Sequence, residues 1–283
     1  MFIHLVKSRT LVYAFAMSAL GVFLVATGGR VTDITVPLRL VPSAYLLALA
    51  TYLYNDITDY RTDAVNARKT VHSLEGTKKA ITVQYTVAFF TISILLAFSI
   101  NIFSGLASVA FAGLALAYSH PRTHLKDMFV VKTAVTGGGA FIASMMGCLA
   151  SGEFSLLGFM ASLIAFLFYF ILGPLGDISD LKGDKEAGRR TLPIIIGIRK
   201  SFIVMIIATF TILSIFVLAN LLLGISRVGE ITGIAISGFI ITRIILASKR
   251  RSDKLELSRC RKMIRYCVFA CQVALLLGTM MWF

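Results

Sequence analysis

The sequence predicts an all-α, polytopic membrane protein, and two observations carry that prediction. First, 57% of its 283 residues are hydrophobic and only 15% are charged, which is too apolar for a protein that is surrounded by water. Second, the apolar residues gather in runs of roughly 20, the length that an α-helix needs to cross a bilayer. These runs lack the alternation of a membrane β-barrel, so strands are disfavoured.

Nine apolar runs are long enough to span a membrane, and we therefore expect nine transmembrane helices in a single domain, 1–283. The first run follows Lys7 and Arg9 and is expected to be a retained helix rather than a cleaved signal peptide. The runs lie near 11–28, 36–54, 80–100, 103–119, 129–150, 154–176, 201–223, 228–248 and 264–283.

The loops predict the orientation of this bundle. Basic residues concentrate in the N-terminus and in segments 55–79, 119–128, 177–200 and 249–263, which all fall on one side. The other side has little beyond Arg30, Arg39 and Arg227. This asymmetry predicts an integral protein of the cell membrane whose N-terminus is cytoplasmic. It also explains most of the net charge of +14 without a nucleic-acid partner. The four cysteines form no CxxC pair, so neither a disulfide framework nor a zinc site is indicated.

Two acidic motifs stand out, and each follows a long apolar run. In both, one Asp is followed by a second three residues later and a third four residues after that, a spacing that places carboxylates on one helical face. Because like charges at this spacing repel, the motifs need cations, and oxygen ligands suit Mg²⁺. The predicted metal ligands are Asn55, Asp56, Asp59 and Asp63 in the first motif and Asp177, Asp180 and Asp184 in the second.

The motifs follow the second and sixth predicted helices, so both are expected at the cytoplasmic face. Carboxylates with a bound metal, ringed by Lys and Arg, would hold a diphosphate at the mouth of an apolar bundle. An isoprenyl diphosphate is a ligand with a diphosphate head group and a long apolar chain. Loss of diphosphate leaves a carbocation that aromatic faces stabilise away from water. Tyr52, Phe166 and Tyr169 are the predicted prenyl-lining residues.

These residues resemble a known family. Asn55, Asp56, Asp59, Asp63 and Asn66 are similar to the first signature of the UbiA superfamily of intramembrane prenyltransferases. The second motif, continued by Gly188 and Thr191-Leu192-Pro193, resembles its second signature. Tyr118-Ser119 with Leu125-Lys126 resembles its middle cytoplasmic loop. The resemblance spans nearly the whole chain. It implies a central cavity with cytoplasmic cap loops and Mg²⁺-dependent prenyl transfer from a diphosphate to an acceptor.

The resemblance also implies roles for individual residues. Asp59, Asp180 and Lys126 would be catalytic. Where many members carry an Arg after the first motif, this chain has Thr70, and Arg68 or Lys69 would supply that charge from a shifted position. The predicted diphosphate-binding residues are Arg68, Lys69, Tyr118, Lys126, Lys132, Lys185 and Arg189.

Several alternatives stay open on the sequence alone. Lys126 and Lys132 also fit snorkelling anchors, and Arg189 fits a topology determinant. The candidate reactions are transfer of geranylgeranyl to a glyceryl phosphate ether lipid and prenylation of an aromatic quinone precursor. A cation-coupled transporter is the alternative of another class, but transport sites lie near the bilayer midplane, whereas these acids are predicted at helix ends.

Overall fold

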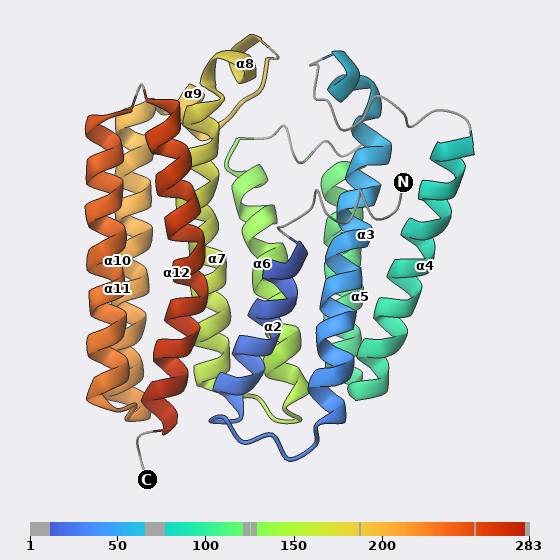
Figure 1. The fold of residues 1–283 in the computed structure, drawn as a ribbon, viewed down its shortest axis with the longest axis vertical. Coiled ribbons are helices and arrows are strands. Elements are labelled where there is room, and N and C mark those ends of the chain that lie inside the picture. Colours follow the sequence, from blue (N-terminus) through green and yellow to red (C-terminus); the bar gives the residue numbers. More distant parts are fainter. Residues whose placement is uncertain are drawn as a thin grey trace.

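The computed structural model describes residues 12–65, 77–120, 125, 129–186, 188–251 and 253–280, with backbone only for residues 59–65 and Thr77. Across this part of the chain the regular structure is helical, without strands, as Figure 1 shows. The helices are α2 (Val12–Ala26), α3 (Thr35–Val65), α4 (Thr77–Ile100), α5 (Ile102–Ser119), α6 (Val131–Ala150), α7 (Leu156–Ser179), α8 (Leu181–Glu186), α9 (Leu192–Ile195), α10 (Ile198–Leu223), α11 (Arg227–Lys249) and α12 (Lys254–Met280).

The all-α membrane fold is confirmed. Among the described residues, eight helices are long and apolar enough to cross a membrane, and α2 adds a shorter apolar helix of 15 residues. A count of nine spans, with α2 as the first, remains a prediction. The surface agrees with a membrane environment, because large apolar side chains of α10 such as Ile203, Ile207 and Phe210 are more than half exposed. Apolar side chains exposed at helical spacing are stable against lipid and costly against water.

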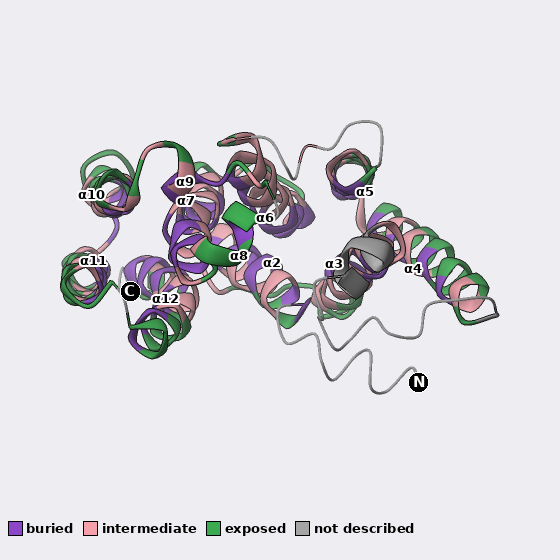
Figure 2. Ribbon diagram, turned by 90° about the horizontal axis from the view of Figure 1, so that it is seen from above, coloured by how far each residue is buried: buried purple, intermediate pink, exposed green. Residues whose placement is uncertain are grey.

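The two larger hydrophobic cores divide the bundle into halves. One core joins α7, α10, α11 and α12, and the other joins α3 and α5 with parts of α4. Helices α2 and α6 contribute to both cores and lie between the halves in Figures 1 and 2. The first acidic motif therefore belongs to one half and the second motif to the other.

Small polar side chains join the helices inside the bundle. Ser18 of α2 and Ser144 of α6 have their hydroxyl oxygens 2.8 Å apart, and Gln272 of α12 donates to the Ser18 hydroxyl at 2.7 Å. Ser43 of α3 and Ser93 of α4 each donate to the other's carbonyl at 2.8 Å. Such contacts stabilise helix pairs in lipid, where burial of apolar surface contributes little. They fix α2 against α6 and α12, and α3 against α4.

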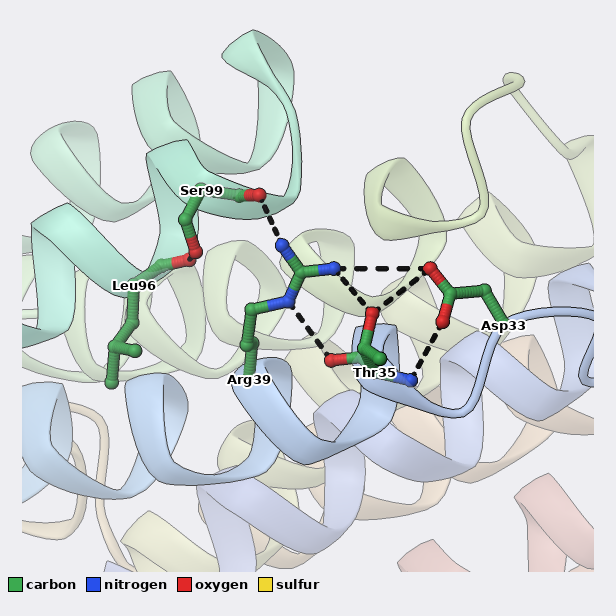
Figure 3. A network of polar contacts seen from close by, with 5 residues as sticks. All are labelled: Asp33, Thr35, Arg39, Leu96 and Ser99. Atoms are coloured by element: carbon green, nitrogen blue, oxygen red, sulfur yellow. Dashed lines mark hydrogen bonds and ion pairs between the residues drawn. The ribbon is translucent and has the colours of Figure 1, made fainter.

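A polar network secures α3 at its N-terminal end, shown in Figure 3. Asp33 accepts hydrogen bonds from the Thr35 amide at 2.8 Å and the Thr35 hydroxyl at 2.9 Å. Arg39 bonds back to Thr35 and reaches the Ser99 carbonyl on α4. The Thr35 hydrogen bonds, with Arg39 nearby, hold the pKa of Asp33 below its ordinary value. This end of α3 is thus anchored to α4, and its opposite end carries the first acidic motif.

Candidate functional site

Both acidic motifs lie at the same end of the bundle, the upper end in Figure 1. The first occupies the last part of α3, and the second begins in the last turn of α7 and continues into α8. Helices α3 and α7 run in the same direction. The apolar part of each helix lies within the bundle, and the motif that follows it lies at the same rim. The structure thus places both motifs at the same end of the bundle, as predicted.

Two carboxylates of the second motif are buried and ion-paired. Asp177 is 7% exposed and accepts a hydrogen bond of 2.7 Å from the Lys132 ammonium of α6. Asp184 is 4% exposed and lies 3.2 Å from Arg189. A buried carboxylate requires a partner of this kind, because removing an unpaired charge from water is costly. Lys132 and Arg189, predicted to bind diphosphate, thus contact the motif itself.

The second motif does not lie on one continuous helix, unlike the predicted strip of carboxylates. Helix α7 ends at Ser179, and Asp180 caps it with a ψ of 9° before α8 begins. Ser and Asp favour helix ends over helix interiors, which explains a break at this point. Asp180 is consequently exposed, whereas Asp177 and Asp184 are buried. No side-chain hydrogen bond or ion pair holds Asp180 among the described residues, so it is the carboxylate of this motif that is open to a ligand.

The first motif is joined to α5. The Ser119 hydroxyl donates to the Asn55 side-chain oxygen at 2.9 Å, and Asp56 is 3% exposed. The backbone remains helical through Asp59 and Asp63, as predicted, but their side chains lie outside the described part of the structure. The contact with Ser119 brings the end of α5, including Tyr118, beside the first motif.

Tyrosines from three helices meet below the motifs. Tyr169 of α7 is close enough to interact electrostatically with Tyr52 of α3 and Tyr118 of α5, and with Arg261 and Arg265 of α12. The two predicted lining residues Tyr52 and Tyr169 are therefore brought together from opposite halves of the bundle. Tyr118, predicted to bind diphosphate, joins the same group.

Phe166 has a different environment from the tyrosines. Its ring and carbonyl lie 3.1 Å from the position that a Cβ on Gly137 of α6 would occupy, and its ring lies 5.2 Å from that of Phe170. Phe166 therefore packs where α6 and α7 approach each other closely. Gly137 permits this approach because it has no side chain.

An arginine that the sequence did not single out lies against the second motif. The guanidinium of Arg261 lies 2.9 Å from the position that a Cβ on Gly176 would occupy, so a side chain there would displace the end of Arg261. Arg261 and Arg265 lie within electrostatic range of each other, and Arg261 also of Asp177 and Asp180. Sequence reasoning grouped Arg261 with the basic loop after the eighth run. The signal it missed is the four-residue spacing of Arg261 and Arg265, which places both on one helix face.

Some predicted residues have no described contacts. Arg68, Lys69, Thr70 and Lys126 lie outside the described residues, and Lys185 is exposed on α8. Within the described part of the chain, no three His, Cys, Asp or Glu side chains form a ready metal cluster.

Known proteins resemble this chain in sequence and in fold. The model of the UbiA prenyltransferase family matches residues 14–269, most of the chain. This chain belongs to the UbiA prenyltransferase family. The resemblance inferred from the two motifs is confirmed, and the chain is an integral membrane prenyltransferase.

Relatives within the UbiA family match over almost the full length. The chain is 26% identical to a digeranylgeranylglyceryl phosphate synthase of Thermococcus kodakarensis, covering 99% of this chain and 98% of that protein. A second synthase of this name, from Thermococcus sibiricus, is 28% identical over 80% of this chain and 79% of its own.

Solved structures share the fold. A UbiA homologue from Archaeoglobus fulgidus, bound to dimethylallyl diphosphate (DMAPP) and Mg²⁺, aligns with a TM-score of 0.69 at 17% identity, covering 97% of this chain and 98% of the other. A digeranylgeranylglyceryl phosphate synthase structure aligns with a TM-score of 0.66 at 19% identity, covering 95% and 94%. At this low identity, the two solved structures show only that this chain shares their helical fold.

Proposed function

We propose that this UbiA-family enzyme transfers a geranylgeranyl group from its diphosphate to the free hydroxyl of a prenylated glyceryl phosphate, with Mg²⁺ as cofactor. The reaction would take place at the cytoplasmic rim of the bundle. The observation that supports the proposal is the position of two acidic motifs, from separate halves of the bundle, at the same end of the bundle, with a group of tyrosines nearby.

The residues at this rim fit Mg²⁺. The donors of both motifs are oxygens, from Asp side chains and from Asn55, and hard oxygen ligands are those that Mg²⁺ prefers. Asp180 is exposed, and Asp59 would complement it from the first motif. When bound, Mg²⁺ would supply neutralisation of the charge that builds on the departing diphosphate.

The other steps fall to this chain's own residues. Lys132 and Arg189 already neutralise two buried carboxylates, which leaves the second motif close to the charge balance that an approaching diphosphate needs. The allylic carbon–oxygen bond breaks, and diphosphate leaves with the electron pair. Tyr52 and Tyr169 can present aromatic faces to the allylic cation. The acceptor hydroxyl oxygen then bonds to that carbon and loses its proton to the released diphosphate or to water.

The names of the relatives support the proposed acceptor. Curated proteins that match the chain over most of its length are named for a product with two geranylgeranyl groups on a glyceryl phosphate. This supports a glyceryl phosphate acceptor, and the aromatic quinone precursor is not retained. The position of the motifs at the rim of the bundle, together with family membership, favours an enzyme over a transporter.

The proposal is tested with purified enzyme in detergent or vesicles. Radiolabelled geranylgeranyl diphosphate is supplied with Mg²⁺ and either geranylgeranylglyceryl phosphate or an aromatic quinone precursor. We expect labelled lipid product and diphosphate release only with the glyceryl phosphate, and loss of both with EDTA. Product with the aromatic acceptor alone, or full activity in EDTA, would contradict the proposal.

A further inference from the structure

We propose that Arg261 and Arg265 form a phosphate-binding site on α12 that holds the phosphate of the acceptor lipid beside the second acidic motif. This inference rests on the proposed glyceryl phosphate acceptor and assigns that acceptor a binding site. It places the two substrates on different cations: the donor diphosphate at the acidic motifs and the acceptor phosphate at the arginines.

Arg261 is positioned for a ligand rather than for a partner within the protein. Its guanidinium packs against the backbone of Gly176, one residue before the first carboxylate of the second motif. Its Nε is buried without a hydrogen-bond partner, and no carboxylate among the described residues lies within ion-pair distance of it. A guanidinium offers five donors in a planar fork that matches a phosphate. Arg261 therefore holds unused donors at the edge of the site.

Arg265 extends this positive charge toward the interior. It follows Arg261 by four residues, which is one turn or about 6 Å further along α12 from the rim. It lies within electrostatic range of both Arg261 and Tyr169. Ionisable residues inside a membrane bundle are costly and usually serve a ligand or a partner. Two adjacent arginines repel each other, and a shared anion removes that repulsion.

Three other described basic residues contrast with this pair. Lys132 is 2.7 Å from Asp177, Arg189 is 3.2 Å from Asp184, and Arg243 of α11 is 2.7 Å from the buried Glu256. Each of these three is committed to a carboxylate of the protein. Arg261 and Arg265 are the arginines of α12 that reach the second motif and Tyr169 with no such commitment among the described residues.

The chemistry of the acceptor requires a phosphate site at this place. The three oxygens of glycerol sit on consecutive carbons, so the hydroxyl that attacks the prenyl group is never more than two carbons from the one that bears the phosphate. The acceptor phosphate must therefore lie close to the donor diphosphate. Two anions and two acidic motifs in one small region repel unless separate cations serve the second anion. The arginine pair, adjoining the motif but outside it, supplies them.

The test compares Arg261→Gln, Arg265→Gln and Arg261→Lys with the wild type in steady-state transfer. We expect KM for geranylgeranylglyceryl phosphate to rise about 10-fold or more in both Gln variants, from the loss of charge-assisted hydrogen bonds, while KM for geranylgeranyl diphosphate changes less than about twofold. Arg261→Lys should recover part of the affinity. The wild type should also prefer this acceptor over its phosphate-free analogue by a factor that shrinks in the variants.

Arg259→Gln is the matched control, because it removes the same charge from the exposed face of the same helix. Thermal stability in detergent excludes misfolding, and the Lys and Arg265 variants carry the test if Arg261→Gln does not fold. A rise in the donor KM alone, or an unchanged acceptor KM in folded variants, overturns the inference. If the wild type itself fails to use the glyceryl phosphate, the proposed function fails instead, so the two failures are distinguishable.

Discussion

The two acidic motifs share a spacing but differ in how the protein holds them. In the second motif, Asp177 and Asp184 are buried against Lys132 and Arg189. In the first, one contact is a neutral hydrogen bond between the Asn55 and Ser119 side chains, and Asp56 is buried as well. The second motif is thus built into the protein's own charge network, which leaves Asp180 as its exposed carboxylate. Within the second motif, the same sequence pattern therefore supplies two buried, ion-paired carboxylates and one exposed carboxylate.

The largest effect is expected from the exposed carboxylate. Asp180→Ala should lower prenyl transfer by about 10²- to 10³-fold, because it removes charge stabilisation of the leaving group. Folding should be unaffected, since the side chain is exposed. Transfer of radiolabelled prenyl measures the effect, and Glu186→Ala on α8, also exposed, is the control. An Asp180 variant with full activity would remove this residue from the mechanism.

A smaller effect on stability, joined to a loss of activity, is expected from Lys132→Met. Asp177 would lose its partner while buried, which costs about 1–3 kcal/mol of unfolding free energy. Adding Asp177→Asn should restore most of the stability but not the activity, since the motif would still lack its carboxylate. Thermal unfolding and transfer assays on both variants test this. Equal stability of wild type and Lys132→Met would mean that the ion pair is not structural.

The smallest effect is expected at the first motif. Ser119→Ala removes one hydrogen bond to Asn55 and should cost about 1 kcal/mol or less. The orientation of Asn55 would loosen, so KM for the prenyl diphosphate should rise modestly. Ser248→Ala, at a half-buried serine whose hydroxyl bonds only its own helix, is the control. An effect as large as that of Lys132→Met would show that both motifs depend equally on protein contacts.

Much of the fold was readable from the sequence. The apolar runs predicted the positions of the long helices, and the placement of both motifs after runs of the same direction predicted that they meet at one end. The sequence placed the start of the last helix at 264, whereas α12 begins at Lys254. The first turns of α12 carry many charged residues, so an apolar run does not reveal them. The sequence therefore did not show that Arg261 and Arg265 lie on one helix.

The chain by itself determined the membrane class, the helices and the acidic pattern, because each follows from the composition and spacing of nearby residues. The break at Asp180, the pairing of Lys132 with Asp177 and the approach of Arg261 to Gly176 were decided only by tertiary packing. Arg261 and Gly176 are far apart in sequence, and their contact depends on how α7 and α12 pack. The sequence shows which residues are charged, and the packing of the helices decides which charged residues become partners.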